Sequence, residues 1–202
     1  MASPKILVAF YSTYGTNQGV AEAAQAAAKA AGAEVRLRKF AETAPKSVVE
    51  GQDAWKAQVE RASSIDEISH DDMLWADGYF FCVPTRYGSA PSQVRAFIDT
   101  LGPLWSEGKL ADKVYTAFTS TQTKRGGQET TLLALHTTFM HLGGIRWLGS
   151  RQPLEGVGDG AEKRAVHSGA HLGEEDDARV DHHRAAEFEQ LLLAAREVAR
   201  LL

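Results

Sequence analysis

Apolar and polar segments alternate along the chain in a way that predicts strands and helices in turn. Residues 5–11, KILVAFY, form a nearly continuous apolar run, which is typical of a strand buried on both faces of a parallel sheet. Residues 18–31 place alanines around a helix with a polar side, and Gly32 provides its stop. Further strands are expected at 33–39, 78–83, 113–120 and 145–150, and further helices at 91–101 and 128–144. The pattern therefore predicts a doubly wound α/β fold with a five-stranded parallel sheet and helices on both faces.

Two segments depart from this alternation within a single expected domain, residues 1–202. Residues 42–75 contain Pro45 and two tryptophans, and we interpret them as an excursion or lid in which Ser63 or Ser64 caps a short helix. Residues 150–178 are rich in Gly, Asp and Glu and predict a long loop, followed by a terminal helix from Asp181.

Composition narrows the classes of function. Lys plus Arg number 22 against 26 Asp plus Glu, and the net charge of -4 disfavours a nucleic-acid partner. Cys82 is the only cysteine, so an intrachain disulfide is excluded. Because no apolar run approaches the roughly 18–20 residues that span a bilayer and the start has no signal-peptide pattern, a cytoplasmic protein without a membrane partner is expected.

Three polar loops follow predicted strands, at the edge where parallel sheets bind ligands. The first, residues 12–17 (STYGTN), offers hydroxyls, an amide and helix N-terminal N–H groups that suit a single phosphate. It has neither the lysine of a P-loop nor the three glycines of a dinucleotide motif, and an ordinary N-capped turn is the alternative.

The second and third loops suit a flat ligand beside that phosphate. Residues 84–89 (PTRYGS) bring a guanidinium and an aromatic ring, from Arg86 and Tyr87, to the same edge. Residues 120–129 (STQTKRGGQE) contain Gly126 and Gly127, which permit a close backbone approach before a helix. Three polar loops at one sheet edge indicate one elongated ligand.

The stretches FYSTYG, VPTRYGS, STQTKRGGQETT and TTFMHLGG, in this order, resemble the WrbA-type FMN-dependent NAD(P)H:quinone oxidoreductases, over about residues 4–150. The resemblance implies a flavodoxin-like fold, bound FMN and NAD(P)H as electron donor. It also implies that family members associate, as dimers or tetramers, with FMN sites near subunit contacts.

The resemblance assigns roles residue by residue. The FMN phosphate is expected at Ser12, Thr13, Tyr14, Gly15, Thr16 and Asn17, and the isoalloxazine ring at Thr85, Arg86, Tyr87 and Gly88. Ribityl and ring atoms are expected at Ser120, Thr121, Gln122, Thr123, Lys124 and Arg125, with His141 near the flavin. Trp105 and Tyr14 are expected to meet substrate, Trp105 in a neighbouring subunit's site.

The implied reaction is a ping-pong transfer of two electrons from NAD(P)H to a quinone. The flavin carries the chemistry, and Arg86 is expected to tune it electrostatically. An FMN-binding electron-carrier flavodoxin and a non-enzymatic interaction module of the same fold stay open as alternatives.

Other chemically active residues have plainer interpretations. Lys124 and Arg125 either attract nucleotide phosphates or are solvated surface residues. Cys82 is expected to be a thiol of the hydrophobic core, with a redox role as the alternative. The histidines of the acidic segment fit no metal-ligand spacing, so no metal site is expected; they are His167, His171, His182 and His183.

Overall fold

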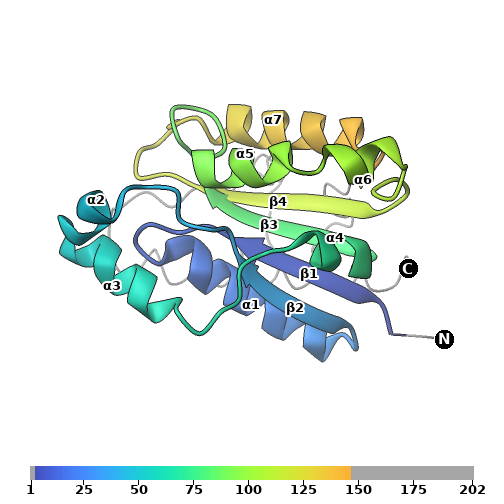
Figure 1. The fold of residues 1–202 in the computed structure, drawn as a ribbon, viewed down its shortest axis with the longest axis horizontal. Helices are drawn as coiled ribbons and strands as arrows, with labels where there is room; N and C mark the ends of the chain where they lie inside the picture. Colours follow the sequence, from blue (N-terminus) through green and yellow to red (C-terminus); the bar gives the residue numbers. More distant parts are fainter. Residues whose placement is uncertain (1–2, 147–202) are drawn as a thin grey trace, which may run out of the picture.

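The computed structural model describes residues 3–146, which form a parallel sheet with helices on both faces (Figure 1). The strands are β1 (Lys5–Phe10), β2 (Glu34–Lys39), β3 (Gly78–Pro84), β4 (Val114–Ser120) and β5 (Ile145–Arg146). The helices are α1 (Thr16–Ala30), α2 (Lys46–Glu50), α3 (Asp53–Arg61), α4 (His70–Trp75), α5 (Ser92–Asp99), α6 (Gly102–Ser106) and α7 (Gln128–His141).

The strand order is β2-β1-β3-β4-β5, with every pairing parallel. This is the order of a flavodoxin-like sheet, in which the chain reverses direction of winding between β1 and β3. The predicted α/β class is therefore confirmed. Four strands of six or seven residues are complete, whereas β5 contributes two described residues beside β4.

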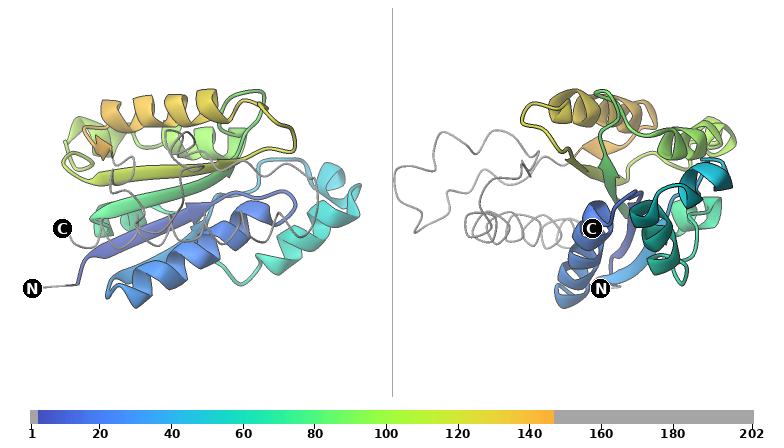
Figure 2. Two further views of the ribbon diagram at one scale, coloured as in Figure 1. Left: turned by 180° about the vertical axis from the view of Figure 1, so that it is seen from behind. Right: turned by 90° about the vertical axis from the view of Figure 1, so that its left-hand side faces the viewer.

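The central strands are apolar because both of their faces are covered. Every residue of β3 and β4 is buried. On one face, Tyr79 and Tyr115 stack at 4.4 Å between ring centroids, and Tyr115 stacks on Phe139 of α7 at 4.8 Å. On the other face, the alanines of α1 lie against Ile6, Val8 and Phe10. Figure 2 shows α1 and α5 on opposite faces of the sheet.

The two arginines of β2 are paired with a carboxylate. Arg36 and Arg38 each contact a different oxygen of Asp72 at 3.0 Å, and Arg36 also lies 4.1 Å from the ring centroid of Trp75. Burial acts to raise the pKa of Asp72, but hydrogen bonds from Ser69 and the two arginines lower it overall. The edge strand is thus fixed to α4, and Trp75 covers this edge.

The excursion forms three short helices. The prediction that Ser63 or Ser64 caps a helix is wrong, because Ser69 caps α4 by a capping box with Asp72. The predicted helix over 91–101 is confirmed as α5, which ends at Asp99, and a separate short helix, α6, begins at Gly102. No helix within residues 3–146 is long and apolar enough to cross a membrane. The loop predicted for 150–178 and the terminal helix lie outside the described residues.

Candidate functional site

The first loop joins the end of β1 to α1 at the carboxyl edge of the sheet. Gly15 adopts a left-handed conformation, with φ of 100°, and its N–H donates to Ser12 Oγ at 2.9 Å. Ser12, Thr13 and Asn17 are all buried. Within the described chain, Asn17 Oδ1 has no hydrogen-bond partner. The first loop therefore presents buried neutral polar groups at the N-terminus of a helix, an arrangement that favours an anionic group.

The second loop makes a tight turn whose two central residues have positive φ. Arg86 N–H donates to Ser89 O at 2.7 Å, and Ser89 N–H donates back to Arg86 O at 3.0 Å. Between them, Tyr87 has φ of 51° and Gly88 has φ of 79°. The ring of Tyr87 is fully exposed. The turn thus presents an aromatic ring that no neighbouring side chain covers.

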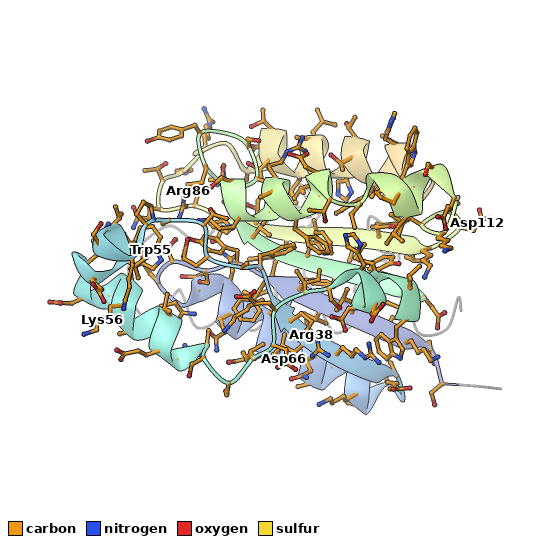
Figure 3. The ribbon with its side chains drawn as sticks, in the orientation of Figure 1. Arg38, Trp55, Lys56, Asp66, Arg86 and Asp112 are labelled. Carbon is orange, nitrogen blue, oxygen red and sulfur yellow. The ribbon has the colours of Figure 1, made fainter. Side chains whose placement is uncertain are left out.

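The guanidinium of Arg86 connects the second loop to the first. Its Nη2 donates to Thr13 Oγ1 at 2.6 Å, and its Nη1 donates to Thr85 O at 3.1 Å. Figure 3 places Arg86 at the carboxyl edge, close to Trp55. Arg86, which the resemblance assigns to the isoalloxazine ring, therefore also contacts the loop that is expected to hold the FMN phosphate.

The third loop touches the second through two glycines. A Cβ placed on Gly127 would lie 2.7 Å from Gly88 Cα, and a Cβ placed on Gly88 would lie 2.7 Å from Thr130 Oγ1. Thr85 and Thr131 join their hydroxyls beneath this contact at 2.7 Å. Only glycine allows the two backbones to approach so closely. The structure thus brings all three predicted loops together as one polar surface.

Lys124 and Arg125 lie in the exposed part of the third loop, and Arg125 has φ of 61°. Ser120 is buried where β4 ends, and its carbonyl accepts from Thr85 N–H at 3.0 Å. The start of this loop is therefore held against the second loop, whereas its two cations face solvent.

A pocket of about 390 Å³ adjoins the second loop, which contributes Arg86 to its lining, and was not anticipated from the sequence. It is lined by Tyr11, Thr43, Ala44, Trp55, Arg86, Pro91, Ser92 and Gln93. Trp55 belongs to the excursion, so this segment forms one wall of the pocket. Of the two tryptophans in the excursion, Trp55 lines this pocket.

Glu42 holds the pocket together by accepting four hydrogen bonds. The donors are Tyr11 OH at 2.9 Å, Ala44 N–H at 2.9 Å, Trp55 Nε1 at 3.0 Å and Gln93 Nε2 at 2.7 Å. Burial acts to raise the pKa of Glu42, but these hydrogen bonds lower it overall. Burial is also the main cause that raises the pKa of Tyr11, so its phenol stays protonated and donates. No sequence motif marks this lone carboxylate.

Trp105 and His141 lie together at the opposite edge of the sheet. Their rings stack at 5.5 Å between centroids, and Trp105 Nε1 donates to His141 O at 3.0 Å. His141 ends α7, whose 14 residues run about 20 Å back from the third loop. Both side chains are exposed. The structure therefore does not bring His141 or Trp105 to the three loops of the same chain.

Residues 4–149 match the NADPH-dependent FMN reductase family. The chain belongs to this family. It is 53% identical over 146 residues to the NAD(P)H dehydrogenase (quinone) of Deinococcus radiodurans, covering 72% of this chain and 73% of that protein. It is 41% identical over 140 residues to the enzyme of the same name from Geotalea uraniireducens, covering 69% and 68%.

The fold of this FMN reductase family member is shared by solved structures. The flavodoxin WrbA-like protein from Agrobacterium tumefaciens superposes with a TM-score of 0.62 at 20% identity, covering 99% of this chain and 97% of that one. A flavodoxin from Streptococcus pneumoniae superposes with a TM-score of 0.60 at 15% identity, covering 98% and 99%. The flavodoxin-like fold is thereby confirmed.

Two remaining predictions for this family member concern single residues. Cys82 is fully buried in β3, and this burial raises the pKa of its thiol. Both properties favour the core-thiol interpretation over a reactive group. The histidines of the acidic segment, from His167 to His183, lie outside the described residues.

Proposed function

We propose that the chain is a WrbA-type, FMN-dependent NAD(P)H:quinone oxidoreductase. The relatives named NAD(P)H dehydrogenase (quinone) and the FMN reductase family support this function. The observation that carries it within the chain is the joining of the three loops, through Arg86 to Thr13 and through Gly88 to Gly127. A cytoplasmic location and a fifth strand completed over residues 145–150 belong to the same proposal.

The residues of the three loops fit FMN. The first loop offers the left-handed Gly15, a helix N-terminus and the buried Asn17 amide, which can turn its NH₂ toward a phosphate. The Gly88 and Gly127 contact holds the second and third loops at backbone distance from each other. FMN would be held by Ser12 to Asn17, by Thr85 to Gly88 and by Ser120 to Arg125.

When bound, FMN supplies the acceptance and release of the hydride equivalent. The protein orients the donor and the acceptor. Tyr14, whose phenol donates to Gln52 of the excursion at 2.8 Å, is held at the phosphate end, where the nicotinamide nucleotide is expected. Arg86 places a positive charge between the first and second loops and would stabilise negative charge that develops beside it.

The stacked pair of Trp105 and His141 supports a homo-oligomer in which one chain completes the site of another. Both rings are exposed, and His141 lies about 20 Å along α7 from the third loop of its own chain. An exposed aromatic pair that already has a fixed geometry suits contact with a planar ligand. In this proposal, the pair covers the flavin and quinone of a neighbouring subunit.

The test is an absorption spectrum of the purified chain followed by NADH and NADPH oxidation with and without benzoquinone. The proposal expects a yellow protein that oxidises a nicotinamide cofactor continuously when quinone is present, and that stops without quinone once the bound flavin is reduced. A yellow protein that does not turn over quinone would favour an electron-carrier flavodoxin. A protein that stays colourless after incubation with FMN would favour a non-enzymatic module.

A further inference from the structure

Arg61, the last residue of α3, lies beside the first loop. A Cβ placed on Gly15 would be 3.4 Å from Arg61 Nη1 and 3.2 Å from Gln58 Oε1. The first loop itself contains no charged side chain. A phosphate monoester carries a charge of about −1.5 to −2 near neutral pH. The excursion therefore delivers a guanidinium to a loop that binds anions with neutral groups alone.

The position of Arg61 is fixed by the way α3 docks on α1. Gln58 Nε2 donates to Gln18 Oε1, and both side chains are buried. Tyr14 OH donates to Gln52 Oε1, directly before the start of α3. Ala62, directly after α3, is buried in the core with the alanines of α1. These contacts hold α3 at the phosphate end of the candidate site.

The guanidinium of Arg61 is only partly engaged within the described chain. Its Nη2 donates to Glu22 Oε2 at 2.9 Å, and the side chains are 51% and 41% exposed. An ion pair this exposed contributes at most about 1 kcal/mol, so it does not lock the arginine in place. Arginine carries five N–H donors, and the Nη1 side faces Gly15.

Arg86 approaches the same loop from the other side, where its Nη2 donates to Thr13 Oγ1. The two arginines thus flank the first loop, one from α3 and one from the second loop. Arg86 is also part of the tight turn of the second loop, whereas within residues 3–146 no hydrogen bond or ion pair joins Arg61 to the second or third loop. If FMN binds with its phosphate at Gly15, the phosphate would therefore be the part of FMN that lies nearest to Arg61.

We propose that Arg61 recognises the phosphate of FMN, so that the excursion determines the preference for FMN over riboflavin. This inference rests on the proposed function, because it assigns a residue to the same FMN site. Glu22 competes for the guanidinium and sets how much of its charge the phosphate receives. Arg61 is a binding residue for the phosphate and has no contact with the reacting ring.

The test compares FMN and riboflavin binding to the full-length chain after its flavin has been removed, by quenching of flavin fluorescence. Arg61→Gln should raise the Kd for FMN about tenfold at low salt, the loss of one charge-assisted hydrogen bond. The Kd for riboflavin should not change. The difference for FMN should shrink at high salt, and Arg61→Lys should recover part of the affinity.

Lys56→Gln is the matched control, because it removes one positive charge from the same helix. Lys56 lies about 140° around α3 from Arg61 and is seen on the outer side of the helix in Figure 3. It should change neither Kd. Glu22→Gln should leave FMN binding equal or tighter, and circular dichroism should show that every variant is folded.

Two results would overturn the inference. One is a Kd for FMN in Arg61→Gln that stays within twofold of the wild-type chain. The other is an equal loss of riboflavin binding, which would indicate a structural effect of the substitution. A wild-type chain that binds neither flavin would instead contradict the proposed function, so the two failures are distinguishable.

Discussion

The two edges of the sheet differ in what they present. At the carboxyl edge, buried polar side chains and left-handed residues join three loops through hydrogen bonds, as between Arg86 and Thr13. At the amino edge, Trp105 and His141 present exposed rings from the short helix α6 and the end of α7. The carboxyl edge therefore offers polar groups that suit an anion, while the amino edge offers exposed aromatic surface.

In the proposed function, one chain carries both halves of a site without assembling it. Each helix that leaves the carboxyl edge runs back along the sheet, so residues late in the helix end at the other edge (Figure 1). The motif that contains His141 follows the third loop closely in sequence, yet α7 separates them by about 20 Å. A second copy is the simplest way to bring the two edges together.

Among the substitutions considered, one that separates the second loop from the third should weaken FMN binding the most. Gly127→Ala would place a Cβ 2.7 Å from Gly88 Cα at a position with φ of 96°. We expect FMN affinity to fall by at least about 100-fold and the free energy of unfolding to fall by about 2–4 kcal/mol. Flavin fluorescence titration and urea unfolding measure the two effects.

Gly19→Ala is the control for that substitution. Gly19 is the fourth residue of α1, and a Cβ there would meet no atom within 4 Å. Alanine should raise the free energy of unfolding by about 0.5–1 kcal/mol and leave FMN binding unchanged. Equal FMN affinity in the Gly127 and Gly19 variants would show that the contact between the two loops does not shape the site.

The amino edge should affect turnover but not flavin binding. Trp105→Ala removes the stacked ring, worth about 0.5–1.5 kcal/mol, so kcat/KM for quinone should fall about tenfold while the Kd for FMN stays constant. Steady-state kinetics on the flavin-loaded chain check this.

Mixing then tests whether the two edges meet between subunits. A mixture of Trp105→Ala and Gly127→Ala chains, unfolded and refolded together, should be more active than either variant alone. In a mixed oligomer, intact loops from one chain would face an intact Trp105 from the other. Activity equal to the average of the two separate variants would contradict a shared site.

The charge of Glu42 should contribute to the free energy of unfolding, because it strengthens the hydrogen bonds that hold the pocket beside the carboxyl edge together. Glu42→Gln keeps the size but removes the charge that strengthens four hydrogen bonds, so the free energy of unfolding should fall by about 1–2 kcal/mol at pH 7. The folded pKa of Glu42 is lowered from its ordinary value of 4.5. Its contribution is therefore present above pH 4.5 and is lost as the pH falls through the folded pKa.

Urea unfolding between pH 3 and pH 7 measures this dependence. The gap between the wild-type chain and Glu42→Gln should be constant near neutral pH and should close in acid. The pKa of Asp72 is also lowered, so Asp72 adds its own pH dependence to the free energy of unfolding. This contribution is the same in the wild-type chain and in Glu42→Gln, and it cancels in the difference between them. A gap that stays the same down to pH 3 would mean that the carboxylate adds nothing as a charge.

The carboxyl edge was predictable from sequence because strand ends in a parallel sheet fall at one edge. The apolar runs before the first, second and third loops were sufficient to bring Ser12, Thr85 and Ser120 together. Glu42 and Arg61 were not predictable, because they lie in a polar excursion whose path across the sheet edge depends on tertiary contacts. The cap at Ser69 was missed for a related reason, since several serines in that segment fit the same pattern.

The smallest expected effect concerns Tyr87, at the centre of the tight turn. Its φ of 51° is unfavourable for a residue with a side chain, and its fully exposed ring contributes no packing. Tyr87→Gly should therefore raise the free energy of unfolding by about 0.5–1 kcal/mol, measured in urea without flavin. If the ring lines the flavin as proposed, the same variant should bind FMN more weakly, by a factor of about three to ten. Stability and affinity changing in opposite directions would show that this backbone strain is kept for binding, whereas a variant less stable than the wild type would show that the ring supports the turn.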